Sequence, residues 1–154
     1  SGAILIAALK EFPNATGIGF ESSPHAHAWA RRNAEALVPG RAEIRLADWS
    51  AADGQFDLVF SNPPYIPSAE IATLEAEVRV YEPRAALDGG TDGRDAYRAL
   101  GRLLPGLLKK SGHAVLELGA GQAGTVELLF PHLRPIRVAP DLAGIARALV
   151  LQKP

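Results

Sequence analysis

The chain has 154 residues, of which 47% are hydrophobic and 21% charged, a composition that suits one globular domain with a sizeable core. The net charge of −1 argues against a nucleic-acid or membrane-surface binder, and the absence of cysteine excludes disulfides and thiolate metal sites and fits a reducing compartment. The longest apolar run, residues 3–9, is too short to span a bilayer and lacks the basic flank of a signal peptide.

Helix signals open the chain. Strong helix formers predict a helix over residues 3–11, which Pro13-Asn14 ends. A second helix is expected to begin at a Ser22 or Ser23 cap, with Pro24 in its first turn, and to run to about Leu37. No methionine is present and the helix follows directly on the first two residues, so we expect the chain to be a piece of something longer.

Short apolar runs between the helices predict strands. Residues 68–94 are polar and contain Pro83 and Gly89-Gly90, which favours a long loop with one helix. Pro105 is expected to kink the helix that follows this loop. The predicted strands are residues 15–20, 42–46, 56–60, 114–118, 136–139 and 146–152, and the later helices are residues 95–110 and 122–129.

The alternation of strands and helices implies crossover connections and a mainly parallel sheet covered on both faces. The last two strands have little helix between them, so they are expected to pair as an antiparallel hairpin. The predicted fold class is a doubly wound α/β sheet.

Ligands of such sheets bind at the carboxyl ends of the strands. Glu21 stands nineteen positions after Gly2, near the spacing at which a nucleotide-binding fold places a carboxylate on ribose hydroxyls. A solvated acid near a helix start is the alternative. Asp48 can accept from an exocyclic amine, and Trp49 either flanks a base or is a core aromatic. The polar clusters at strand ends are Ser1-Gly2, Glu21, Asp48-Trp49 and Asn62 to Tyr65.

A glycine motif, G-x-G-x-x-G, occupies residues 119–124 between a predicted strand and a predicted helix. Asp141 follows at about the dinucleotide-binding distance, so the template is nominally satisfied. Only 30 residues follow Gly124, too few for the rest of a mononucleotide-binding half. A tight strand-to-helix turn is the alternative to a nucleotide site.

The stretch "FSNPPYIP", residues 60–67, ends a strand with many acceptors and few donors. Two adjacent prolines have no N–H groups but keep their carbonyls, and the Asn62 side chain adds another carbonyl. A flat group that donates two N–H bonds would fit there, beside the Tyr65 ring. A rigid exit from the strand is the alternative.

The combination of strand, asparagine, two prolines and tyrosine resembles the motif of amino-directed methyltransferases that use S-adenosylmethionine (SAM). The resemblance implies that the Asn62 side-chain oxygen and the Pro63 carbonyl hold two N–H bonds of a nitrogen attached to an sp² carbon. Holding them orients the nitrogen lone pair along the S–CH₃ axis. Tyr65 is expected to stack on the flat group and face the sulfonium. With Pro64, these residues form the expected substrate site.

Further blocks are similar to one family, the protein-(glutamine-N5) methyltransferases of peptide chain release factors, known as HemK or PrmC. They occur in the family's order and cover essentially the whole chain. The related DNA and RNA enzymes share NPPY but not the block after it. The matching blocks are Asp48-Trp49, "NPPYIP" at 62–67, "VRVYEPRAALDGGTDGRDAYRAL" at 78–100, "LELGAGQ" at 116–122 and "PDLAGIARALV" at 140–150.

The resemblance implies that residues 1–154 are a SAM-dependent catalytic domain that lacks the family's first strand and helical N-terminal domain. Ser1-Gly2 are the end of the first SAM motif, around the methionine part. Glu21 takes the ribose hydroxyls, where the family commonly has aspartate, and Asp48 and Trp49 border the adenine. Asn62 bridges cofactor and substrate. The glycine motif is then only a turn.

The resulting expectation is a cytoplasmic enzyme that methylates the glutamine of a release factor's Gly-Gly-Gln loop and leaves S-adenosylhomocysteine. It needs neither metal nor membrane, and nucleic acid is not its expected substrate. The alternatives are an N-methyltransferase of adenine or guanine amino groups, and a nucleotide-binding module built on the glycine motif.

Overall fold

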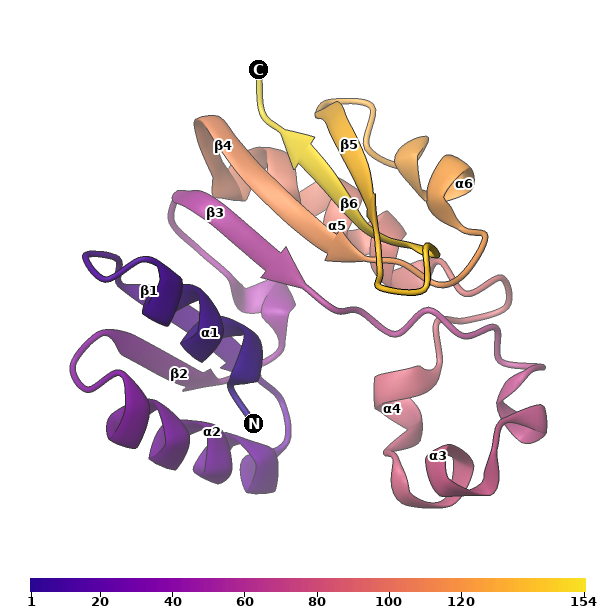
Figure 1. The fold of residues 1–154 in the computed structure, drawn as a ribbon, viewed down its shortest axis with the longest axis horizontal. Coiled ribbons are helices and arrows are strands. Elements are labelled where there is room, and N and C mark those ends of the chain that lie inside the picture. Colours follow the sequence, from indigo (N-terminus) through magenta and orange to yellow (C-terminus); the bar gives the residue numbers. More distant parts are fainter. The chain divides into compact units, whose positions relative to one another are not determined.

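The computed structural model describes all residues from 1 to 154, which form two compact units, residues 1–54 and 55–154 (Figure 1). Each unit has its own hydrogen-bonded sheet. The first unit consists of α1 (Ala3–Glu11), β1 (Gly17–Glu21), α2 (Pro24–Leu37), β2 (Ala42–Leu46) and a 3₁₀ turn (Trp49–Ala51). The second consists of β3 (Phe56–Ser61), a 3₁₀ turn (Ile71–Thr73), α3 (Ala76–Tyr81), α4 (Arg84–Leu87), α5 (Asp95–Leu107), β4 (Leu108–Glu117), α6 (Ala123–Glu127), β5 (Arg134–Pro140) and β6 (Ala146–Gln152).

In the first unit, β1 and β2 pair in parallel and both helices share one hydrophobic cluster against them. A Cβ atom on Gly17 would lie 2.5 Å from Leu5 of α1, so only glycine allows the helix this close to the strand. The predicted cap of α2 is confirmed, because the Ser23 hydroxyl accepts from the Ala26 N–H at 3.4 Å and Pro24 opens the helix. The clustered side chains are Ile6, Leu9, Ala34 and Val38, flanked by Leu5, Ala15, Ala42 and Ile44.

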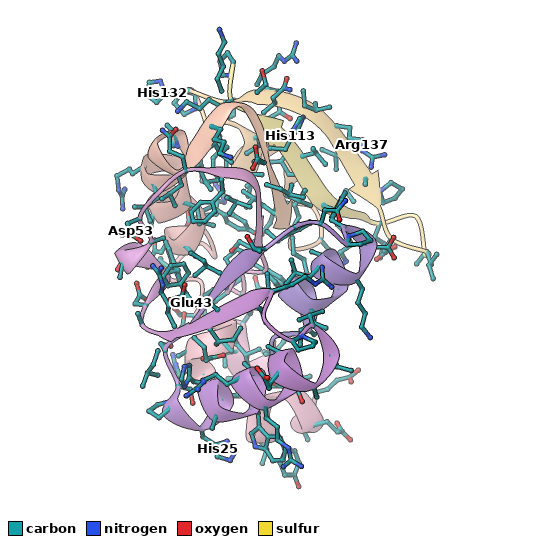
Figure 2. All side chains as sticks on the ribbon, turned by 90° about the vertical axis from the view of Figure 1, so that its left-hand side faces the viewer. His25, Glu43, Asp53, His113, His132 and Arg137 are labelled. Carbon is teal, nitrogen blue, oxygen red and sulfur yellow. The ribbon has the colours of Figure 1, made fainter.

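The side chains on the face of β2 opposite the hydrophobic cluster are charged. Arg45 lies over the Phe20 ring, 5.8 Å from its centroid, and its guanidinium pairs with Glu43 at 2.8 Å and Asp53 at 2.9 Å. Glu43 and Asp53 are labelled in Figure 2. On this face of the sheet, Glu43 and Arg45 of β2 lie opposite Ile18 and Phe20 of β1, so it combines charged and apolar side chains.

The Arg41 side chain closes the C-terminal end of α1. Its Nη1 atom donates to carbonyls at the end of the helix and in the following turn, of which that of Phe12 also accepts from the Ala15 N–H. The accepting oxygens belong to Leu9 (2.7 Å), Phe12 (3.3 Å), Pro13 (3.0 Å) and Ala15 (3.5 Å).

Arg41→Ala is expected to lower the free energy of unfolding by about 1.5–3 kcal/mol, since a charged donor is lost and half-buried carbonyls stay unpaired. Arg31→Ala, which removes an exposed arginine of α2, is the control and should change stability by less than about 0.5 kcal/mol. Urea unfolding of the full-length protein measures both. Equal effects of the two substitutions would contradict the capping role.

In the second unit the strand order is β3-β4-β6-β5. β3 and β4 are parallel, while β6 is antiparallel to both of its neighbours, so the predicted C-terminal hairpin is confirmed. Along β4 buried residues alternate with half-buried ones, and Ala114 and Leu116 lie opposite Leu151 and Leu149 of β6. Helix α5, which lies behind the sheet in Figure 1, adds fully buried Tyr97 and Leu104 to this core.

Several predicted boundaries were wrong, two of them by more than two residues. The helix expected to run to Lys110 ends at Leu107, and β4 starts at Leu108 rather than at Ala114. The cause is tertiary, because Leu108 pairs with Phe56 of β3 and the ladder resumes at His113 after an irregularity at Ser111, whose φ is 62°. The loop expected over 68–94 contains α3 and α4, which are almost wholly exposed: Val80 is 63% and Tyr81 82% accessible.

The hydrogen-bonded ladders of the two units are separate. β1 pairs only with β2, and β3 pairs only with β4, so no hydrogen-bonded ladder joins β1 to β3. No helix within residues 1–154 is both long and apolar enough to cross a membrane.

Candidate functional site

In the first unit, the carboxyl ends of β1 and β2 bring two of the predicted acids together. Glu21 lies opposite Leu46 in the parallel ladder, and the Ala47 N–H donates to the Glu21 carbonyl at 3.1 Å. Asp48 therefore follows directly beside Glu21. Because the connection from α1 to β1 reverses the chain, and Leu5 packs on Gly17 and Gly19, the start of α1 lies toward this same end.

Ser1 and Gly2 form the start of α1. Gly2 is left-handed, with φ 76°, and the Ser1 carbonyl accepts from the Asn33 side chain at 3.0 Å. The first N–H groups of a helix have no intrahelical partner and carry the positive end of its dipole. This start can therefore hold an anionic or polar ligand group.

Both carboxylates accept from a nearby backbone N–H. Glu21 Oε1 accepts from the Ser23 N–H at 3.0 Å and its Oε2 has no protein donor, while Asp48 Oδ1 accepts from the Ser50 N–H at 2.8 Å. The hydrogen bonds from Ser50 hold the pKa of Asp48 below its ordinary value, so it is ionised at neutral pH. Trp49 next to it is half-buried.

The chemistry of this set fits a nucleoside with a charged tail. One carboxylate can accept from a diol, the other from an exocyclic amine, and the indole can flank a base. The helix start suits a carboxylate on the tail. Each of these groups belongs to residues 1–54.

In the second unit, Asn62 to Tyr65 follow β3 beside the end of β4, where Ser61 lies opposite Leu116. Asn62 is exposed and Pro63 is buried. Neither the Asn62 side chain nor the carbonyls of Pro63 and Pro64 hydrogen-bond any protein group. The exposed Asn62 side chain is therefore available to a ligand, and the two proline carbonyls beside it are unpaired.

The Tyr65 ring is tied to the end of β4. Its hydroxyl donates to Glu117 Oε1 at 3.2 Å, and the Glu117 carbonyl accepts from the Tyr97 hydroxyl at 2.7 Å. Burial, and after it the neighbouring Glu117 carboxylate, raises the pKa of Tyr65, so the phenol stays neutral and remains a donor. The ring orientation is thus set by its oxygen, which leaves the ring faces for other contacts.

The segment "EPRAALDGG", residues 82–90, pairs directly with the NPPY segment, which sequence reasoning missed. Ile66 donates to the Leu87 carbonyl at 3.0 Å and accepts from the Gly89 N–H at 2.8 Å, and Ser68 donates to the Gly90 carbonyl at 2.9 Å. The Asp88 carboxylate accepts from the Ser68 hydroxyl at 2.5 Å, which is the main cause of its lowered pKa. The two motifs were both recognisable in the sequence, but nothing local in either indicated their pairing.

The glycine motif at 119–124 forms a turn, as its alternative interpretation predicted. The helix after it, α6, has only five residues. Asp141, the expected ribose acid, instead accepts from the N–H groups of Ala143 and Ile145, both at 2.9 Å, and from Arg147 at 3.1 Å. These bonds close the β5–β6 connection. The Asp141 carboxylate therefore does not serve as the ribose-binding acid that the nucleotide interpretation requires.

Comparison with known proteins gives long matches to one group. The chain is 46% identical over 157 residues to the release factor glutamine methyltransferase of Rhodospirillum rubrum, covering 99% of this chain and 48% of that protein. It is 50% identical over 155 residues to the one of Caulobacter vibrioides, covering 97% of this chain and 54% of that protein. The chain thus spans about half the length of the curated relatives it matches. No protein-family model matches it.

Solved structures with the same fold include methyltransferases. A methyltransferase from Pyrococcus furiosus aligns with a TM-score of 0.71 at 18% identity, covering 98% of this chain and 69% of that one. TrmN from Thermus thermophilus aligns with a TM-score of 0.69 at 16% identity, covering 98% and 40%. N-methyltransferase NodS from Bradyrhizobium japonicum, in complex with S-adenosyl-L-homocysteine, aligns at 0.54 and 12% identity, covering 89% and 66%. The predicted Rossmann-like methyltransferase fold is therefore confirmed.

Proposed function

We propose, since the chain belongs to the release factor glutamine methyltransferase family, that it methylates the side-chain amide nitrogen (N5) of a glutamine in a release factor. The acceptor glutamine is that of the Gly-Gly-Gln loop, and the reaction takes place in the cytoplasm. One observation carries the proposal: the Asn62 side chain and the Pro63 carbonyl, on a segment stiffened by two prolines, have no partner in the protein.

The first unit would hold SAM. Glu21 would accept from the ribose hydroxyls, and Asp48 and Trp49 would border the adenine. The first-turn N–H groups after Ser1 and Gly2 would take the methionine part. Bound there, SAM would supply an electrophilic methyl group on a sulfonium, with S-adenosylhomocysteine as the product.

The second unit would prepare the nucleophile. An amide nitrogen is a poor nucleophile because its lone pair is delocalised into the carbonyl. Asn62 Oδ1 and the Pro63 carbonyl would accept its two N–H bonds and orient the lone pair along the direction of attack. One N–H proton leaves to solvent as the N–C bond forms. Two neutral acceptors suit this step, because a carboxylate would stabilise the sulfonium of the ground state more than the dispersed charge of the transition state.

Tyr65 would stack on the flat amide and face the sulfonium. Its hydroxyl is held by Glu117, so the ring is positioned before the substrate arrives. The competing acceptor, the amino group of adenine or guanine, also offers two N–H bonds on a flat frame, so the acceptors at Asn62 and Pro63 do not distinguish the two. The net charge of −1 disfavours a phosphate backbone as the main handle.

A competition experiment tests the substrate. The full-length protein is given labelled SAM with release factor, duplex DNA and ribosomal RNA under the same conditions. We expect label on the release factor alone, and none on a release factor whose Gly-Gly-Gln glutamine is replaced by alanine. Robust labelling of nucleic acid with none on the release factor would refute the proposed substrate and favour the base-modifying alternative.

A further inference from the structure

The Gln122 side chain spans two segments that carry different motifs. Its Nε2 donates to the Tyr65 carbonyl at 2.9 Å, while its Oε1 accepts from the Gly119 N–H at 3.2 Å. The turn after β4 and the NPPY segment are thereby joined through one amide. Gly119 is buried and Gln122 is half-buried, so water competes little for these two bonds.

The space around the bond between Gln122 and Tyr65 is closed by a glycine. Gly93 is buried and left-handed, with φ 71°, and a Cβ atom there would lie 2.4 Å from the Tyr65 carbonyl oxygen and 3.0 Å from Gln122 Nε2. The same Cβ would lie 3.2 Å from Pro67. The Tyr65 carbonyl is therefore held in a slot between the Gly119–Gln122 turn and the Gly89–Gly93 turn.

We propose that Gln122 is a positioning residue for methyl transfer: it sets the place of the Asn62 and Pro63 acceptors by fixing the carbonyl of Tyr65. The inference rests on the proposed function. Pro63 and Pro64 each lock one backbone dihedral, so a constraint at Tyr65 passes back along the segment with little loss. The phenol end of Tyr65 is fixed separately by Glu117, which makes Gln122 the main-chain half of a two-point attachment.

This role differs from general support of the fold. The Gln122 carbonyl, not its side chain, accepts the Val126 N–H and the Thr125 hydroxyl, both at 2.9 Å, so α6 does not depend on the amide. Gln122→Glu keeps the side-chain shape and the acceptor for Gly119 but loses the donor to Tyr65. It therefore isolates one bond. Gln55→Glu makes the same charge change at an exposed glutamine that makes no side-chain hydrogen bond, and serves as the matched control.

The test uses the full-length protein with labelled SAM and release factor. Gln122→Glu is expected to lower kcat about tenfold or more with the KM for SAM unchanged, as misplacement of reacting groups does. Its kcat relative to wild type should recover as the pH falls toward 5, since a carboxyl with an ordinary pKa near 4.3 becomes a donor again when protonated. Gln55→Glu should match wild type throughout. A Gln122→Glu variant with wild-type kcat, or with a deficit that pH does not change, would overturn the inference.

A second measurement does not depend on the substrate. Amide hydrogen exchange of a peptide covering residues 60–68 should be several-fold faster in Gln122→Glu than in wild type or Gln55→Glu, with the melting temperature used to exclude global unfolding. Wild-type enzyme that leaves the release factor unlabelled would refute the proposed function. Unchanged exchange in residues 60–68 would refute the role of Gln122 by itself.

Discussion

Asn62→Ala is expected to cut the rate of methyl transfer by roughly 10²-fold or more, the range for removal of one positioned hydrogen-bonding group in a catalytic site. The Asn62 side chain is exposed and has no partner in the protein, so its removal should cost little stability. The loss should fall on kcat, because the interaction that orients the amide nitrogen is lost while the cofactor residues of the first unit remain.

Single-turnover kinetics on the full-length protein measure this rate directly. Asn14→Ala, which removes an exposed asparagine between α1 and β1, is the control and should leave the rate unchanged. Asn62→Asp is a sharper comparison: it keeps the size of the side chain but places a negative charge near the proposed sulfonium, so it should bind SAM at least as tightly and still turn over slowly. A wild-type rate in Asn62→Ala would contradict the proposal that Asn62 and the Pro63 carbonyl orient the amide nitrogen.

Glu21→Ala is expected to weaken SAM binding by about 10²-fold or more, since the two charge-assisted hydrogen bonds proposed to the ribose hydroxyls would be lost, each contributing about 1.5–3 kcal/mol. Tyr65→Ala should leave SAM affinity nearly intact and lower turnover, because its proposed contact is with the substrate amide.

Calorimetry of both variants in the full-length protein separates cofactor from substrate roles. Glu11→Ala, at the exposed end of α1, is the matched control for loss of a carboxylate. Equal SAM affinity for wild type and Glu21→Ala would contradict the proposal that SAM binds at the carboxyl end of β1.

Elements with strong local signals were predicted almost to the residue. The Ser23-Pro24 start of α2 and the apolar runs of β2 and β6 were placed with the bounds that the structure has. The start of β4 was missed because Leu108 to Lys110 continue a helix-compatible sequence, and only pairing with Phe56 makes them a strand. Tertiary pairing overrode local propensity there.

The candidate site shows the same difference between features with a local sequence signal and features that depend on tertiary contacts. Glu21, Asp48 and the NPPY segment could be proposed as site residues because strand ends are visible in the sequence and ligands of such sheets bind at the carboxyl ends of the strands. The residues that hold these segments in place through hydrogen bonds were not predicted. Gln122 was assigned only to a turn, and Asp88 lay in a segment expected to be mostly loop, because each acts through contacts with residues far away along the chain.

The pairing of Ile66 with Leu87 and Gly89 has a consequence for how this protein family can diversify. These hydrogen bonds join the two ends of the segment that carries α3 and α4. The backbone near Asn62 and Pro63 is therefore held in place independently of the length of that segment. Lengthening a closed loop is thermodynamically mild, about 0.6 kcal/mol for each doubling. We therefore expect that changes in the length of the exposed segment that carries α3 and α4 leave Asn62 in place.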